Sequence, residues 1–438
     1  MKKRILLFLG FTILILTFFA FSVSAEEDMP DLSGVQNVFV YNIENDKTLY
    51  AKNETDRIYP ASTAKIMTGV MAVELYRDNL SDLITVTQEA LGNYKGKNIK
   101  LKAGEVVSIE NLIYAVIVGG ANDAAYVLAY EMSGSHELFI DNMNQKAIEL
   151  GMKNTKYTNP SGYPDSEMYT TAEDTAILAK YAYHVTDYME ICSSARYVFP
   201  ETNMSKTRYI YNSNYLIATN IETKYKNKEV EGMNAGSTVE GGHVVVTAVK
   251  KEGMTNIFVL MGGSYDDENV YSYIAANELI DWAFENFEYK KILDSGEMVC
   301  EIDVNLSGQV DYVVLSPAKT IEYFLPSSVD IKKDIVRDVE LYKNSLNAPI
   351  PEGYIAGRIT LSYDGKVISE VDLVTKNSVE RNSLLYILAR IKDFTSSPKF
   401  KIVIVCVVAA VVLYFAIAIY NRTRSKRYRY KYRKNGRR

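Results

Sequence analysis

Hydrophobic and polar residues alternate with a period of two near the start of the chain, as they do in a half-buried strand. The alternation runs from Val35 to Ala51 and is interrupted by the polar stretch Glu44–Lys47, which predicts a hairpin. From Ser62 to about Tyr76 the apolar residues recur at helical spacing instead. Strands at both ends of a mainly helical middle predict an α+β fold whose terminal strands share one antiparallel sheet. Further helices are expected at about 110–133, 136–151, 171–189 and 270–287, and two β-rich runs joined by a turn at 243–264.

The pattern changes after about Lys290, where short apolar runs are separated by Gly, Pro and Asp-Gly. These runs predict a small all-β domain, and Tyr-Asp-Gly-Lys at 363–366 predicts one of its hairpins. Residues 26–400, about 375 in number, exceed what one hydrophobic core usually organises, so two domains are expected. Leucines and an isoleucine recur at helical spacing in 379–399, which indicates a short amphipathic helix near a membrane.

Both ends of the chain have the composition of membrane signals. Three basic residues, an apolar run and a small-residue end predict a secretory signal peptide at 1–25, cleaved after Ala25, and a retained N-terminal anchor is the alternative. Nineteen uncharged residues from Ile402 to Tyr420 would span roughly 29 Å as a helix, enough to cross a bilayer. Ten Lys and Arg follow without an acid, which predicts a cytoplasmic tail.

The region between these ends is strongly acidic. Residues 26–400 hold 35 Lys and Arg against 54 Asp and Glu, a net charge of −19, which argues against nucleic acid as a partner. Cys192, Cys300 and Cys406 make no disulfide framework, although a bridge between the first two is left open. His243 and the other two histidines stand far apart without metal-ligand spacing. They are expected to be ordinary surface or core residues, and no metal or cofactor is predicted.

One short motif is suited to nucleophilic catalysis. Ser62 opens a predicted helix after Pro60, and Lys65 lies one turn further on the same face. A lysine shielded from water can take the proton of a serine hydroxyl, and a helix N-terminus favours the negative charge of a tetrahedral oxyanion. The same Ser-x-x-Lys spacing also occurs at 316–319 and 396–399. There a proline follows the serine within two residues, so these matches do not have the same helical context. The motif by itself leaves two roles for Ser62 open, nucleophile and helix N-cap.

The wider sequence resembles a known family. Residues 38–74, VFVYNIENDKTLYAKNETDRIYPASTAKIMTGVMAVE, are similar to the opening of the serine D-alanyl-D-alanine carboxypeptidases, the low-molecular-weight penicillin-binding proteins. The similarity continues in the family's order through GGANDAAYVLA, NTKYTNPSGYPDSEMYTTAEDTAILAKYA and GMNAGSTVEGGHVVVTAVKKEG, and it covers roughly 33–375. The resemblance implies a penicillin-recognising serine peptidase or β-lactamase-like domain, an antiparallel sheet packed with helices. A small all-β domain and a C-terminal transmembrane helix would follow.

Together, the residue patterns and the resemblance divide the chain into segments. Residues 26–290 would form the penicillin-binding, DD-peptidase-like domain, and 291–378 the β-rich C-terminal domain. An amphipathic juxtamembrane segment at 379–400, a transmembrane helix at 401–421 and a basic cytoplasmic tail at 422–438 complete the expected order. The implied location is the cell membrane, with the catalytic body outside and facing the cell wall.

For the site, the resemblance implies an acyl-enzyme. Ser62 would attack the carbonyl between two terminal D-alanines of a peptidoglycan stem peptide, with Lys65 as the base, and β-lactams would be trapped at the same serine. The backbone N–H groups of Ser62 and Ser237 would form the oxyanion hole. The residues expected to contact substrate are Asn122, Asn234, Gly236 and Ser237.

Two of the three family motifs are altered in this chain. Gly120-Ala121-Asn122 stands where the family has Ser-x-Asn, so the serine hydroxyl that helps pass a proton to the leaving group is missing. Asn234-Ala235-Gly236 stands where the family has Lys-Thr-Gly, so the cation and the hydroxyl that receive the substrate's terminal carboxylate are missing. A charge-assisted hydrogen bond contributes about 1.5–3 kcal/mol, so its loss is expected to weaken binding roughly ten- to a hundred-fold.

Three functions therefore remain open from the sequence. The first is a D-Ala-D-Ala carboxypeptidase-family serine hydrolase of weakened or altered activity. The second is a non-catalytic wall protein that binds peptidoglycan or a partner on the same fold. The third is a hydrolase of the same fold whose substrate has no free C-terminal carboxylate.

Overall fold

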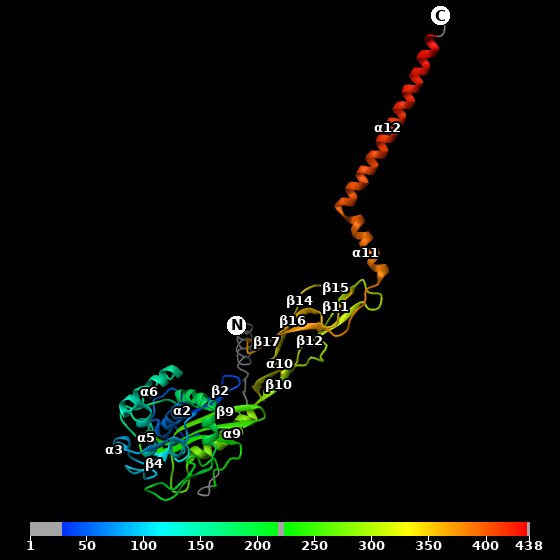
Figure 1. Cartoon of the computed structure of the whole chain (residues 1–438). Coiled ribbons are helices and arrows are strands. Elements are labelled where there is room, and N and C mark those ends of the chain that lie inside the picture. Colours follow the sequence, from blue (N-terminus) through cyan, green and yellow to red (C-terminus); the bar gives the residue numbers. More distant parts are fainter. Residues whose placement is uncertain (1–28, 218–222, 436–438) are drawn as a thin grey trace, which may run out of the picture. The chain divides into compact units, whose positions relative to one another are not determined.

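A computed structural model describes residues 29–217 and 223–435, and the chain divides into two compact units, each with its own hydrophobic core (Figure 1). The first unit ends at Glu288 and the second begins at Tyr289. The signal peptide predicted at 1–25 lies outside the described residues.

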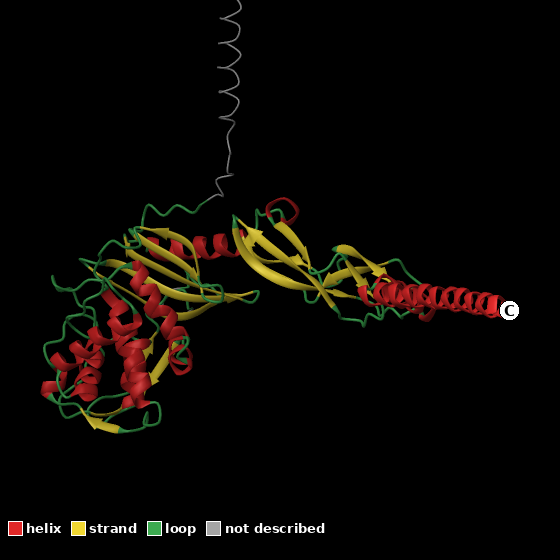
Figure 2. Ribbon diagram, turned by 90° about the horizontal axis from the view of Figure 1, so that it is seen from above, coloured by secondary structure: helices red, strands yellow, loops and turns green. Residues whose placement is uncertain are grey.

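The first unit is built on a five-stranded antiparallel sheet in the order β2-β1-β9-β8-β7 (Figure 2). The predicted hairpin is β1 and β2, and the two predicted β-rich runs are β8 and β9. Because β1, near the start of the unit, pairs with β9, near its end, the predicted α+β arrangement is confirmed. The strands are β1 Asn37–Asn42, β2 Lys47–Lys52, β7 Val230–Thr238, β8 Gly242–Lys251 and β9 Met254–Gly263.

Helices cover the sheet, and all ten residues of β9 are buried. Ile257, Val259 and Met261 face the large core that also contains side chains of α2, α4, α5 and α7. Phe258 and Leu260 point to the other face, because successive side chains of a strand alternate, and α9 packs against β8 and β9. The helices of this unit are the short 3-10 turn η1 Ala61–Thr63, α2 Ala64–Tyr76, α3 Gln88–Leu91, α4 Ile109–Ile117, α5 Asn122–Ser133, α6 His136–Leu150, α7 Ala172–Tyr183, α8 Thr186–Cys192 and α9 Tyr271–Asn286.

Two long helices expected from the periodicity are each two shorter ones. The helix expected over 110–133 breaks between α4 and α5 at Gly119-Gly120, where Gly120 has a φ of +65°, a conformation that suits glycine. The helix expected over 171–189 breaks between α7 and α8 at His184-Val185. The first break has a consequence for the site, because α5 now begins at Asn122 and presents its N-terminal residues to a cavity.

Two short strand pairs in the first unit were not expected. They are β3 Leu83–Thr85 with β4 Val106–Ser108, and β5 Arg196–Phe199 with β6 Arg208–Tyr211. A buried carboxylate joins the two pairs, because Glu105, which precedes β4 and is fully buried, accepts a hydrogen bond from the Arg208 guanidinium at 2.7 Å. The contact fixes the β5–β6 hairpin to the segment that precedes β4.

The second unit contains the β-rich domain that the sequence predicts. Its six-stranded sheet has the order β14-β16-β17-β12-β11-β15, and a separate pair joins β10 and β13. The hairpin predicted at 363–366 is the β16–β17 turn, in which Asp364 and Gly365 both have positive φ, as such turns require. The elements are β10 Phe287–Leu293, β11 Cys300–Asn305, β12 Tyr312–Pro317, β13 Ile321–Pro326, α10 Ile331–Asp334, β14 Val336–Leu341, β15 Ser345–Asn347, β16 Ile355–Tyr363 and β17 Lys366–Thr375.

Two helices follow the second unit's sheet, α11 Ser383–Ser396 and α12 Pro398–Asn435. Among the described residues, one helix is long and apolar enough to cross a membrane, and it covers 398–424 within α12. It includes the span expected at 401–421. The three cysteines, including Cys192 and Cys300, are free.

We predict that Arg208→Met destabilises the chain by about 3–5 kcal/mol, because it leaves the Glu105 carboxylate buried without its cation. Urea unfolding measures the loss. The matched control is Lys206→Met, which breaks an ion pair whose two side chains are 88% and 57% exposed, and which should cost no more than about 0.5 kcal/mol. Equal losses of stability in the two variants would show that the buried ion pair contributes no more than the exposed one.

Candidate active site

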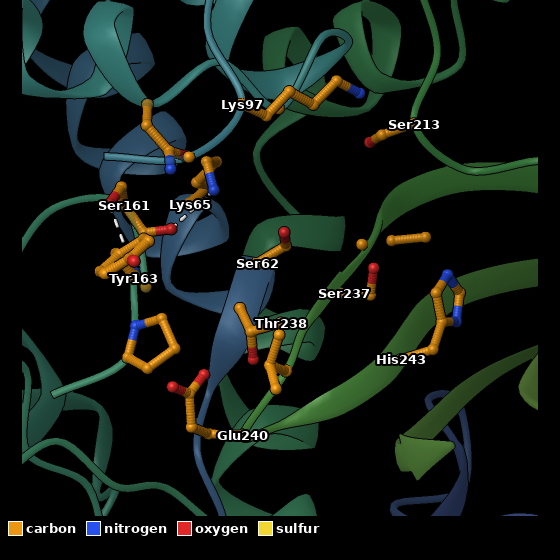
Figure 3. A pocket seen from close by; sticks show the side chains of 18 of the residues that line it. Ser62, Lys65, Lys97, Ser161, Tyr163, Ser213, Ser237, Thr238, Glu240 and His243 are labelled. Carbon is orange, nitrogen blue, oxygen red and sulfur yellow. Dashed lines mark hydrogen bonds between the residues drawn. The ribbon is translucent and has the colours of Figure 1, made fainter. Parts of the chain in front are cut away.

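A cavity of about 590 Å³ in the first unit gathers most of the residues that the sequence singled out (Figure 3). The start of α2, the start of α5 and strand β7 all contribute to its wall. Asn234 is not among the lining residues, whereas its neighbour Ala235 is. The predicted site residues that line the cavity are Ser62, Lys65, Asn122, Gly236 and Ser237.

Ser62 lies in the middle of the turn η1 and does not cap a helix. The N-cap positions of η1 and α2 are Pro60 and Thr63, and neither has a side-chain capping hydrogen bond. Ala61, directly before the serine, has a φ of +46°, which is strained for a residue with a side chain and costs on the order of 1–3 kcal/mol. Gly162 packs so closely that a Cβ there would lie 1.6 Å from the Ala61 carbonyl oxygen. The turn is therefore held from outside, and the N-cap alternative is wrong.

Lys65 is buried on the first turn of α2, with 3% of its surface exposed. Its Nζ donates a hydrogen bond to the Ser161 carbonyl oxygen at 2.6 Å. Burial, and secondarily the charge of Lys97, lowers the pKa of Lys65 to about 7. A substantial fraction of this amine is therefore unprotonated at neutral pH, as a general base must be.

The loop that holds Lys65 is itself cross-linked. The Asn159 carboxamide oxygen accepts hydrogen bonds from the backbone N–H groups of Ser161 and Tyr163. From α2, the Thr68 hydroxyl donates to the Pro160 carbonyl oxygen at 2.7 Å. The carbonyl that receives the Lys65 amine is thus fixed by the helix that supplies the amine.

Strand β7 approaches Ser62 at Gly236. A Cβ at this position would lie 2.2 Å from the Ser62 Oγ, so the strand can pass the serine only because the residue is glycine. Ser237 and Thr238 follow and line the cavity. The backbone of β7 therefore borders the serine hydroxyl directly.

Asn122 and Asn234 have different surroundings. The Asn122 side-chain N–H donates to the Lys95 carbonyl oxygen at 2.5 Å, so this amide holds a neighbouring loop as well as lining the cavity. Asn234 is 1% exposed, and neither its side-chain oxygen nor its nitrogen has a hydrogen-bond partner among the described residues. A buried polar group left unpaired in this way typically costs about 1–3 kcal/mol.

His243 has a more specific place than the sequence indicated. It is buried on β8, lines the cavity, and its Nδ1 lies 2.5 Å from the Ser272 hydroxyl. Burial lowers its pKa to about 4, so the ring is uncharged at pH 7. It adds no positive charge to the part of the cavity that β7 and β8 border.

Several lining residues had no individual signal in the sequence. They lie in irregular segments whose conformation depends on hydrogen bonds between side chains and the backbone. Hydrophobic periodicity therefore does not predict where these residues lie. Ser161 lies within NTKYTNPSGYPDS, a stretch similar to the family, and could have been found there. The residues missed are Lys97, Ser161, Ser213 and Glu240.

Comparison with known proteins identifies the family of this chain. A family model described as D-alanyl-D-alanine carboxypeptidase matches residues 25–265, and one described as the penicillin-binding protein 5 C-terminal domain matches 287–381. The D-alanyl-D-alanine carboxypeptidase DacF of Bacillus subtilis is 28% identical over 395 residues, 89% of this chain and 97% of the relative. DacA of Haemophilus influenzae is 30% identical over 374 residues, 82% of this chain and 90% of the relative.

Solved structures are similar as well. Penicillin-binding protein 5 from Haemophilus influenzae matches with a TM-score of 0.57 at 27% identity, covering 81% of this chain and 99% of that one. Penicillin-binding protein 6B from Escherichia coli, at 21% identity and a TM-score of 0.58, shows the same fold. The chain belongs to the D-alanyl-D-alanine carboxypeptidase family, the low-molecular-weight penicillin-binding proteins.

We predict that the stability difference between wild type and Lys65→Met depends on pH. The pKa of Lys65 is about 7 in the folded chain against an ordinary value of 10.5, so the unfolded chain binds an extra proton between these values. Wild type should therefore gain stability relative to Lys65→Met as the pH rises from about 7 to 10. Melting temperatures across this range measure the trend. A constant difference would mean that Lys65 keeps its proton when folded.

Proposed function

We propose that this chain is a serine-type D-Ala-D-Ala carboxypeptidase that acts on peptidoglycan stem peptides through a Ser62 acyl-enzyme, with weakened or altered activity. The observation that supports it most is the pairing of Ser62 with a buried lysine of lowered pKa in one cavity. The order of the family motifs and the similarity to carboxypeptidases over most of the chain support the substrate class.

The chemistry follows from the state of Lys65. Its unprotonated amine takes the proton of the Ser62 hydroxyl, and the oxygen attacks the carbonyl between the two D-alanines. The N–H groups of Ser62 and Ser237 receive the oxyanion. The C–N bond then breaks, the proton goes to the leaving D-alanine nitrogen, and water hydrolyses the acyl-enzyme with Lys65 again as base. A penicillin would acylate the same serine.

The weakened activity concerns recognition of the substrate's terminal carboxylate. The part of the wall that β7 and β8 form carries no cation, because Ala235 and the uncharged His243 line it and the buried Asn234 beside them is uncharged as well. Loss of that charge removes roughly ten- to a hundred-fold in affinity for a carboxylate. The same feature favours a second candidate, a hydrolase whose substrate has no free C-terminal carboxylate.

We further propose that α12 anchors the chain in the cell membrane, with the first unit facing the wall and the basic tail in the cytoplasm. The apolar helix at 398–424 and the run of Lys and Arg after it support this topology.

Labelling with a fluorescent penicillin tests the proposal. Wild type should form a covalent adduct that Ser62→Ala abolishes, and it should release D-alanine from a stem-peptide mimic. A mimic ending in a carboxamide should react within about tenfold of the free acid, because β7 lacks the cation that discriminates them. Measurable affinity for muropeptides without adduct or D-alanine release would favour the non-catalytic binding protein instead.

We predict that Gly236→Ala reduces the rate of penicillin labelling at least about a hundred-fold, since its Cβ would lie 2.2 Å from the Ser62 Oγ and displace it. The control is Gly296→Ala in the second unit, where the nearest atom to a new Cβ is a flexible carboxylate oxygen at 3.2 Å. Normal labelling of Gly236→Ala would show that Ser62 does not react beside β7.

A further inference from the structure

Glu240, in the turn between β7 and β8, is the only acid among the described residues that line the cavity. Its side chain is exposed, and among the ion pairs of the described residues none includes it. Figure 3 shows it at the end of the cavity opposite to Lys97 and Ser213, with its carboxylate turned towards the interior. The two ends of the cavity therefore differ in charge.

The turn that carries Glu240 is held against the segment that carries Ser62. The Thr238 hydroxyl oxygen accepts a hydrogen bond from the Gly241 N–H at 2.9 Å, which closes the turn. A Cβ added at Gly241 would lie 3.3 Å from the Ala61 Cβ, so the two backbones are in close contact. Since Ala61 directly precedes Ser62, the backbone at Glu240 keeps a fixed place relative to the nucleophile.

The charged groups of the cavity wall leave the Glu240 carboxylate available to a ligand. Lys65 is buried and donates a hydrogen bond to the Ser161 carbonyl oxygen, and Lys97 lies at the opposite end of the cavity. His243 is uncharged at pH 7, because burial lowers its pKa to about 4. A cationic group of a ligand would therefore meet Glu240 without competition from the residues that line the cavity.

Strand β7 gives the cavity a direction. It ends the order β2-β1-β9-β8-β7, so no further strand of the described chain pairs with its outer edge, and an extended peptide can lie along that edge. In the proposed function, the oxyanion lies at Ser237, and the substrate's terminal carboxylate lies on the side of Asn234 and Ala235. The acyl part of the peptide must then run the other way, past Thr238 towards Glu240.

The residue before the penultimate D-alanine is the one whose side chain can reach this carboxylate. Residues of an extended chain are about 3.3 Å apart, so this residue lies beside Thr238 when the scissile carbonyl lies at Ser237. Glu240 follows two residues later, within the reach of a long side chain. An amine at the end of such a side chain is protonated at pH 7 and can pair with the carboxylate.

We propose that Glu240 selects stem peptides in which the residue before the D-Ala-D-Ala end carries a free side-chain amine. The proposal rests on the proposed function, which sets the direction of the peptide along β7. Glu240 is a specificity-determining residue in this proposal, because its carboxylate binds the ammonium group and takes no part in the transfer of the acyl group.

Two stem-peptide mimics that differ by one acetyl group test the inference on the detergent-solubilised full chain. Both end in D-Ala-D-Ala, and the preceding residue is lysine in one and Nε-acetyl-lysine in the other. Wild type should release D-alanine from the free amine with a kcat/KM about two- to fivefold higher, as an exposed ion pair allows, and added salt should reduce this preference. Glu240→Gln should bring the ratio to about one, and Glu240→Lys should reverse it. Glu252→Gln, in the turn between β8 and β9 and outside this cavity, is the matched control and should keep the wild-type ratio.

Failure of the inference can be told apart from failure of the proposed function. D-alanine release with a ratio of one in wild type, or with a preference that Glu240→Gln leaves unchanged, would overturn the inference and uphold the proposed function. If wild type releases no D-alanine from either mimic, the proposed function fails, and the equilibrium affinities of the same mimics are compared instead. The free amine must then bind wild type more tightly than the acetylated mimic does, and Glu240→Gln must bind the two equally. Equal affinities in wild type, or no binding at all, reject the inference.

Discussion

The burial of one lysine side chain is the constraint on which the site depends. An ammonium group taken out of water loses several kcal/mol of solvation, and the fold compensates Lys65 with a hydrogen bond to the Ser161 carbonyl oxygen. The carbonyl is useful only if it does not move, and Asn159 and Thr68 fix its loop from two directions. The remaining cost appears as a lowered pKa. The same burial that costs stability therefore leaves the amine unprotonated and able to act as a base at neutral pH.

Much of the architecture could be predicted because it depends on local patterns. The alternation over 35–51 and the helical period after Ser62 determine which faces are buried, and the β1–β9 pairing follows from placing terminal strands in one sheet. Ser62, Lys65 and Gly236 could be predicted together because the family's motifs occur in order, and the structure gathers them in one cavity.

The site residues that the sequence did not predict are positioned by tertiary contacts, which leave no periodic pattern in the sequence. Lys97 reaches the cavity because Asn122 and Asp123 bind the backbone of its loop, although it lies more than twenty positions before them. The break at Gly120, which creates the N-terminus of α5, interrupts an otherwise continuous helical pattern. Likewise, only the packed strands show that Asn234 is buried while Ala235 faces the cavity.

In the proposed function, the site keeps one half of the family's chemistry and changes the other. Formation of an acyl bond needs a nucleophile, an unprotonated base and a close strand, and in the proposed function Ser62, Lys65 and Gly236 provide these. Recognition of a terminal carboxylate needs a cation on β7, and Asn234 cannot provide one. Since the two requirements reside on different elements, one can be lost while the other survives. Reactivity and selectivity would therefore depend on separate elements of this cavity.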